Sequence, residues 1–278
     1  MVTVAAENVA RLWDAETGAE VSTLKGHQKP VWVAEYLPDG SGIVTASADG
    51  TARLWNAATG QQVRLFEGHR GPILHEAISG DGRLLATAST DGTARIWRID
   101  DGSAVATLLS HKQALCCVQM SPNGLRAITA SIDGTARLWD TQSGKMLAIF
   151  KGTPQGFGTP AGMVVVIRFS PDGRLAATAH EDHVIRMWYA LDGSPAAELE
   201  GASAEITDAA FSSEGGLFAA ASEDGTARIW QLRGWRDGEL QVSDATALQP
   251  RRQGSRMSKM KAVVFTRDNN FVLTAGDD

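Results

Sequence analysis

The chain of 278 residues lacks the features that stabilise small secreted proteins or carry a chain across a membrane. Its only 2 cysteines, Cys116 and Cys117, are adjacent, so they cannot close a loop. This excludes a disulfide-rich secreted module and favours a reducing compartment, so we expect a cytoplasmic location. The longest apolar run, Met163–Ile167, is too short to span a bilayer, and residues 1–14 lack a signal-peptide pattern. We therefore expect no membrane association.

An excess of positive charge is also missing. The chain has 26 Lys and Arg against 32 Asp and Glu, a net charge of -6. This balance argues against a general nucleic-acid coat, so no nucleic-acid partner is expected. The hydrophobic share of 43% is sufficient for a buried core, which excludes a disordered chain.

Tryptophan, in contrast, is present in a regular pattern. Six of the 8 Trp are spaced 42 residues apart, except for one gap of 49 residues. A fixed period in the low forties is typical of a repeat architecture. The six are Trp13, Trp55, Trp97, Trp139, Trp188 and Trp230.

Each repeat is predicted to form four short strands. In the unit 26–66, apolar runs are separated by turn residues such as Pro38-Asp39-Gly40. The pair Asp49-Gly50 between two such runs is a strong hairpin signal, because Gly accepts a positive φ. No segment has an apolar stripe at helical spacing, so the chain is predicted to be all-β. The predicted strands are 31–36, 43–47, 51–55 and 62–66.

These units resemble the WD-repeat family of β-propellers. The resemblance depends on a Gly-His pair, a Ser-Pro-Asp-Gly-like turn, an Asp-Gly turn and a Trp that closes the third strand. Asp follows that Trp only at Asp14 and Asp140. The resemblance implies four-stranded antiparallel blades around a central channel.

The phase of the repeats predicts how the blades are arranged. We expect a single β-propeller domain over residues 1–278, with partial blades at 1–25 and 260–278. We favour a seven-blade layout with an incomplete seam. The alternative is a six-bladed closure, in which the C-terminal first strand completes the N-terminal blade. Unpaired strand edges at a seam favour association between molecules.

A Ser-His-Asp trio, His27, Ser47 and Asp49, invites a catalytic interpretation. The same trio recurs twice at the repeat spacing, whereas a nucleophilic site needs one prepared pocket. The resemblance implies instead that Trp, Ser, His and Asp form a buried hydrogen-bond chain in each blade. We therefore expect no catalytic residue. The predicted structural tetrads are His27, Ser47, Asp49 and Trp55; His69, Ser89, Asp91 and Trp97; and His111, Ser131, Asp133 and Trp139.

The fourth complete repeat departs from this pattern, because His180 stands where Ser is usual and no Gly-His pair precedes it. We expect His180 to substitute for the missing loop His and to pair with Asp182. The pair His180 and His183 has a faint resemblance to a metal site, but no further Cys or His is close in sequence. We therefore predict no metal and no cofactor.

The residues that differ between repeats are the candidates for partner binding. The resemblance implies that one face is lined by the start of each first strand and by the residue before each turn Asp. One arc of this face is apolar, and a run of cations follows Trp230. The alternatives are that the apolar side chains are tucked between blades and that the cations lie on a solvated loop. The candidates are Trp32, Leu74, Cys116, Ile132, Met163, Val165, Arg251, Arg252, Lys259 and Lys261.

The predicted function is a non-enzymatic scaffold that binds proteins or peptides on one propeller face. The first alternative is a regulatory or sensor fragment of a larger protein, such as one with a kinase domain. An enzyme that uses the central channel is the least favoured, because the sequence shows no unique polar cluster for it.

Overall fold

A computed structural model describes residues 1–5, 7–109, 111–151, 164–236, 239–243, 245–248 and 259–277. Every regular element in these ranges is a β-strand, so the predicted all-β class is confirmed. The described residues include no helix with the length and hydrophobicity that a membrane crossing requires. The chain divides into two compact units, Met1–Asp133 with Trp139–Met146, and Gly134–Leu138 with Leu147–Asp278.

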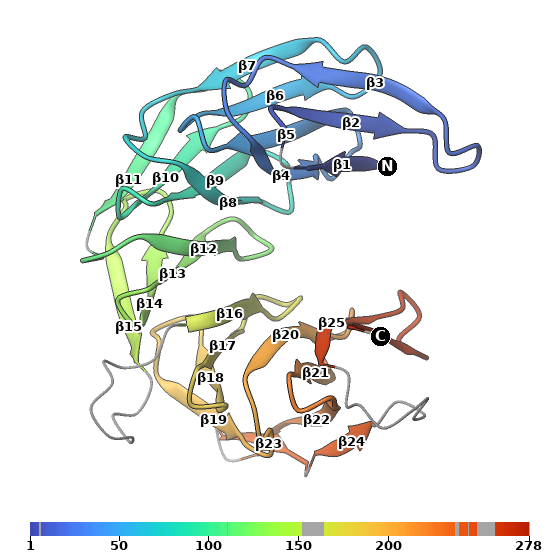
Figure 1. The fold of residues 1–278 in the computed structure, drawn as a ribbon. Helices are drawn as coiled ribbons and strands as arrows, with labels where there is room; N and C mark the ends of the chain where they lie inside the picture. Colours follow the sequence, from blue (N-terminus) through green and yellow to red (C-terminus); the bar gives the residue numbers. More distant parts are fainter. Residues whose placement is uncertain are drawn as a thin grey trace. The chain divides into compact units, whose positions relative to one another are not determined.

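The first unit begins with a three-stranded sheet in the order β1-β2-β3, followed by four-stranded antiparallel sheets (Figure 1). In each sheet the chain runs back and forth between neighbouring strands. The strands of the three-stranded sheet are β1 (Val2–Val4), β2 (Val9–Trp13) and β3 (Glu20–Lys25). Those of the next two sheets are β4 (Val31–Tyr36), β5 (Gly42–Ser47), β6 (Ala52–Asn56) and β7 (Gln62–Phe66), then β8 (Ile73–Ile78), β9 (Leu84–Ser89), β10 (Thr93–Arg98) and β11 (Ala104–Leu109).

The next sheet, in the order β12-β13-β14-β15, contains residues of both units. Its strands are β12 (Leu115–Met120), β13 (Arg126–Ser131), β14 (Thr135–Asp140) and β15 (Met146–Lys151).

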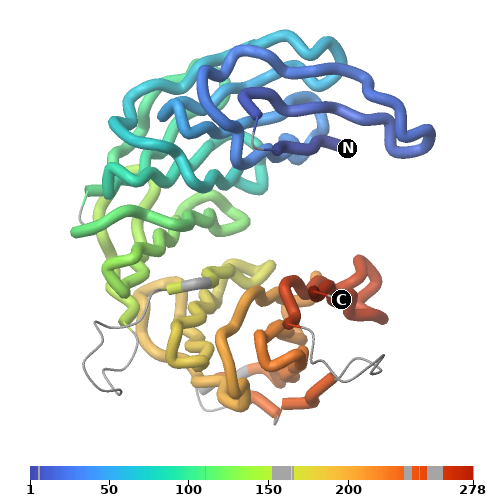
Figure 2. The backbone as a smooth tube through the Cα atoms, viewed as in Figure 1, coloured from blue at the N-terminus to red at the C-terminus, as the bar shows by residue number. Residues whose placement is uncertain are grey.

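The second unit continues the same pattern, and its chain path can be followed in Figure 2. The last sheet has only two strands, so partial sheets occur near both ends, in agreement with an incomplete seam. The strands are β16 (Val164–Phe169), β17 (Leu175–His180), β18 (Ile185–Tyr189) and β19 (Pro195–Leu199); β20 (Ile206–Phe211), β21 (Leu217–Ser222), β22 (Ala227–Arg236), β23 (Glu239–Val242) and β24 (Thr246–Leu248); and β25 (Met260–Phe265) and β26 (Val272–Gly276).

The repeated tryptophans fill the space between successive sheets of a unit. Trp55 of β6 packs with Leu12 and Leu24 of the preceding sheet, and Trp97 of β10 packs against Phe66 at 5.9 Å between ring centroids. Aromatic side chains of this size contribute most of the apolar area that such a core removes from water. The Trp spacing in the sequence therefore reflects one large side chain for each gap between blades.

The predicted Asp-Gly turns follow from backbone geometry. Gly50, between β5 and β6, has a φ of 83°, which residues with a Cβ rarely adopt. A Cβ at this position would also lie 3.1 Å from the carbonyl oxygen of Gly71. Only Gly fits this turn without moving the neighbouring loop.

One position in the core of the first unit carries a charge-bearing side chain. Glu76 of β8 is 2% exposed, and neither carboxyl oxygen has a hydrogen-bond partner. Burial, and then the nearby charge of Glu35, raises the pKa of Glu76 well above its usual value. The matching positions in other sheets are occupied by Val118, Ile167 and Ala209, all of which are buried.

The sheet that contains Trp230 departs from the four-strand pattern. β22 continues past Trp230 to Arg236, and two short strands replace the usual fourth strand. β24 pairs with residues 227–229 of β22, and β23 pairs with residues 232–236. The weak pattern of this segment in the sequence corresponds to this split strand.

Candidate functional site

A β-bulge recurs at the start of the first strand of the sheets. In β4 the register shifts between Val31 and Val33, so that Trp32 is an extra residue with no partner on β5. The same shift occurs at the matching position of β8, β12, β16, β20 and β25. A bulge re-aims the extra side chain and is often found next to binding sites. The extra residues are Trp32, Leu74, Cys116, Val165, Thr207 and Lys261.

In the first unit these extra residues form an apolar series. β4 packs against β8, and β8 against β12, so the bulges lie at the same end of three neighbouring strands. Trp32 is 44% exposed, whereas Leu74 and Cys116 are half-buried. Ile132, which directly precedes the turn residue Asp133, is 46% exposed. We name Trp32, Leu74, Cys116 and Ile132 the bulge face.

The remaining predicted partner-binding residues are less fully described. Met163, Arg251 and Arg252 lie outside the described residues. Val165 lies in β16 at the bulge, and only its backbone is described.

Lys259 and Lys261, two of the cations expected to bind a partner, are paired with acids in the structure. Their ammonium groups lie 2.5 and 3.0 Å from the Glu223 carboxylate, and Lys261 also lies 3.9 Å from Asp277. Hydrogen bonds from both lysines lower the pKa of Glu223 below its usual value. Glu223 follows β21, so the neutralising charge comes from the neighbouring sheet, which the local sequence around the lysines does not show.

A hydrogen-bond chain links the two ends of the β4–β7 sheet. The indole N–H of Trp55 donates to Thr45 Oγ1 at 2.8 Å, and Thr45 Oγ1 lies 2.8 Å from His27 Nε2. His27 Nδ1 lies 2.9 Å from Asp49 Oδ2. The same chain recurs with Trp97, Thr87, His69 and Asp91, and with Trp139, Thr129, His111 and Asp133.

The hydrogen-bond donors in this chain determine the tautomer of the His27 imidazole. The Thr45 oxygen accepts from Trp55, so its hydroxyl proton is free to donate to His27 Nε2. His27 Nδ1 then carries the proton that is donated to Asp49. Burial lowers the pKa of His27, although the bond to Asp49 acts in the opposite direction. The imidazole is therefore held neutral with its proton on Nδ1.

Asp49 is the acceptor at the end of the chain. Burial tends to raise its pKa, but hydrogen bonds from Thr51, the Gln28 N–H and His27 outweigh it and lower the pKa to about 2. The carboxylate therefore stays ionised and ties the loop before β4 to the turn between β5 and β6.

The predicted place of serine in this chain is wrong. Thr45, not Ser47, lies between Trp55 and His27. The Ser47 hydroxyl donates to the Lys29 carbonyl and accepts the Asp49 N–H. Ser89 makes the matching bonds, to the Gly71 carbonyl and from the Asp91 N–H. Ser131 donates to the matching Gln113 carbonyl at 3.3 Å and to the Ala114 carbonyl at 2.9 Å, and it accepts from the Asp133 N–H.

A sequence signal for the threonine exists. Thr stands ten residues before Trp in five of the six repeats. In the β5–β6 hairpin Thr45 pairs with Arg53 and Trp55 pairs with Ile43, so the Thr45 and Trp55 side chains are diagonal neighbours on one face of the sheet. The exception is Ala220, which precedes Trp230 by the same distance. The catalytic interpretation also fails on this geometry, since His27 contacts Thr45 and Asp49 rather than Ser47.

The repeat with His180 keeps part of the chain. The Trp188 N–H donates to Thr178 Oγ1 at 2.9 Å, and His180 Nε2 lies 3.1 Å from the same hydroxyl. His180 therefore contacts Thr178 from within the strand, in place of the loop His. Burial raises the pKa of Asp182, but its hydrogen bonds from Arg186 at 2.8 and 3.2 Å, with the charges of Arg186 and His180, outweigh this and lower it. Across the described ranges, no three His, Cys, Asp or Glu side chains gather closely enough to hold a metal ion.

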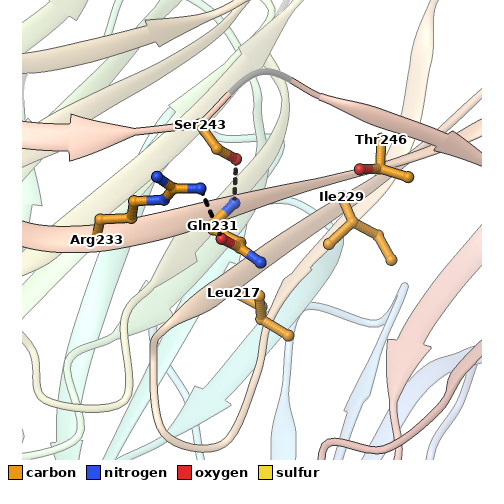
Figure 3. A pocket seen from close by; sticks show the side chains of 6 residues that line it. All are labelled: Leu217, Ile229, Gln231, Arg233, Ser243 and Thr246. Atoms are coloured by element: carbon orange, nitrogen blue, oxygen red, sulfur yellow. Dashed lines mark hydrogen bonds between the residues drawn. The ribbon is translucent and has the colours of Figure 1, made fainter.

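A surface pocket of about 480 Å³ lies where the fourth strand of the Trp230 sheet is split (Figure 3). The Gln231 N–H donates to Ser243 Oγ at 2.9 Å, and Arg233 donates to Gln231 Oε1 at 3.2 Å. Leu217, Ile229 and Thr246 complete the lining. Among the residues that the structure describes, the lining holds no His, Cys, Asp or Glu.

The repeated four-stranded sheet, with a Trp on its third strand and a His–Asp link between the loop before its first strand and its second turn, defines a class of propeller repeats. The sequence model of the family WD domain, G-beta repeat matches residues 18–56, 60–98, 102–140, 149–189 and 193–231. These ranges make up more than half of the chain, and the chain belongs to this family. WD-repeat proteins are generally protein-interaction scaffolds. The comparison with curated proteins gives no match.

Proposed function

We propose that the chain is a non-enzymatic scaffold that binds an apolar segment of a partner protein on the bulge face. The observation that supports this is the exposure of Trp32 at a bulge, next to strands that carry Leu74 and Cys116 at the same position. Large aromatic side chains are typical anchors in interfaces, and an apolar patch on a stable frame is a typical partner surface.

The frame and the face use different residues, which supports the proposal. The frame is held by side-chain hydrogen bonds among His27, Thr45, Asp49 and Trp55. The bulge residues are not part of that chain.

The test is selection of binding peptides from a random library, followed by calorimetric measurement of their affinity. Trp32 is 44% exposed, so covering it removes on the order of 100 Å² from water, equivalent to about 2–3 kcal/mol. We expect selected peptides to be rich in apolar residues and to lose roughly 30-fold or more in affinity on Trp32→Asp. Leu191→Asp is the matched control, because Leu191 is 79% exposed and follows β18, at the end of its sheet opposite the bulge of β16. Equal losses for both variants would remove the bulge face as the binding surface.

We also propose that a second copy of the chain associates through the free edge of β26. No described strand pairs with β26 apart from β25, and Phe271 and Leu273 are 67% and 58% exposed. Thr274 occupies in β26 the register position that Thr45 occupies in β5. The Thr45 hydroxyl accepts a hydrogen bond from the Trp55 indole N–H on the neighbouring strand β6. An unpaired strand edge with exposed apolar residues is prone to pairing between molecules.

A further inference from the structure

The two cysteines lie together at one of the bulges. In β12 the register shifts between Leu115, opposite Ser131, and Cys117, opposite Ala130, which leaves Cys116 as the extra residue. Adjacent residues of a regular strand point to opposite faces, but two residues of a bulge oppose a single partner residue. The bulge therefore removes the separation that alternation would impose on the two thiols.

The thiols contact each other in the reduced state. Both side chains are half-buried and neither is in a disulfide. A hydrogen bond to Cys117, and then burial, raises the pKa of the Cys116 thiol. The Cys116 thiol therefore stays protonated beside Cys117, and both side chains remain partly open to solvent.

Closure of a disulfide between these residues is geometrically unfavourable. Consecutive Cα atoms are about 3.8 Å apart, whereas Cα atoms joined through a disulfide are usually about 4.4–6.8 Å apart. A zinc ion is also a poor fit, because structural zinc sites need four ligands. In the described part of the chain no third His, Cys, Asp or Glu joins the two thiols in a cluster that could hold a metal ion. The two thiols suit a soft, thiophilic atom that needs only two sulfur ligands. Such an atom bridges the sulfurs without requiring a direct S–S bond.

We propose that Cys116 and Cys117 form a dithiol site that captures monosubstituted trivalent arsenicals. Two As–O bonds of the hydrated arsenical, RAs(OH)2, break and two As–S bonds form. The two thiol protons leave with the two hydroxides as water. Arsenic stays trivalent and no oxidant is required.

The test uses phenylarsine oxide and intact-mass measurement, with wild type, Cys116→Ser and Cys117→Ser. The second As–S bond forms within the molecule, so we expect the wild-type adduct to resist displacement by excess glutathione about 100-fold longer than either single variant. A dithiol competitor releases it. Far-UV circular dichroism verifies that the serine variants are folded. Equal lifetimes in all three proteins would overturn the proposal.

A second comparison tests the bulge itself. A synthetic peptide with the sequence of residues 115–120 has the same adjacent cysteines but no sheet to orient them. We expect the folded protein to hold the adduct longer than the peptide, and an equal lifetime would contradict the role of the bulge. The readout involves no partner protein, so its outcome is independent of the proposed function.

Discussion

Thr45→Val tests the hydrogen-bond chain at its central link. Valine has nearly the same shape as threonine, but it neither accepts from Trp55 nor donates to His27 Nε2. Thr45 is 0% exposed, so both partner groups are left buried without a replacement. A buried polar group that loses its partner costs about 1–3 kcal/mol, so we expect the free energy of unfolding to fall by roughly 2–4 kcal/mol.

The decisive measurement is a double-mutant cycle with Trp55→Phe, because the coupling energy separates a direct bond from general destabilisation. Urea unfolding followed by far-UV circular dichroism avoids the loss of a fluorescent Trp. We expect a coupling of about 1 kcal/mol between Thr45→Val and Trp55→Phe. Ser47→Ala is the matched control, and it should be additive with Trp55→Phe within about 0.5 kcal/mol, since Ser47 bonds the backbone at Lys29 and Asp49. Coupling at Ser47 and none at Thr45 would refute the chain as described.

Three further predictions concern stability and association. Trp139→Ala should lower the melting temperature more than Trp230→Ala, because the Trp139 N–H bonds Thr129 whereas Ala220 stands at the matching position for Trp230; equal losses would contradict this. Glu76→Val should stabilise the protein by roughly 1–3 kcal/mol at pH 7, because it removes a buried carboxyl without partners. The folded-state pKa of Glu76 is raised, so the carboxyl costs least below the unfolded-state value of about 4.3, and the stability of the protein falls as pH rises from there through the folded-state pKa. Glu76→Gln should therefore reduce the dependence of the melting temperature on pH. The same pH dependence in the variant and the wild type would be evidence against this. Leu273→Lys should abolish concentration-dependent association in sedimentation velocity, and a wild type that stays monomeric at all concentrations would rule out the β26 edge.

The repeat spacing was sufficient to predict the fold class. A Trp spaced 42 residues from the next, with Asp-Gly turns between short apolar runs, predicts four-stranded sheets. The sheets predicted around Trp55, Trp97 and Trp139 are present with the expected strand order. The split strand after Trp230 was not predictable, because β23 and β24 are too short to carry a clear alternating pattern.

The exposure of two candidate residues was predictable from the repeat pattern, whereas their role in binding stays a prediction. Trp32 and Ile132 were expected on an exposed face, and both side chains are exposed. The bulge that re-aims Trp32 depends on register, which the sequence does not state. The pairing of Lys259 with Glu223 joins residues of different sheets, and the choice of Thr45 over Ser47 depends on which hydroxyl faces the indole. These features come from tertiary packing rather than from local pattern.

Photo-crosslinking on the bulge face tests the proposed scaffold function most directly. A photoreactive phenylalanine analogue replaces Trp32 in one protein and Leu191 in another, and each is irradiated with a peptide selected on the wild type. The account predicts a crosslinked product from position 32 and none from position 191, with the attachment site identified by peptide mapping. A product from position 191, with none from position 32, would contradict it.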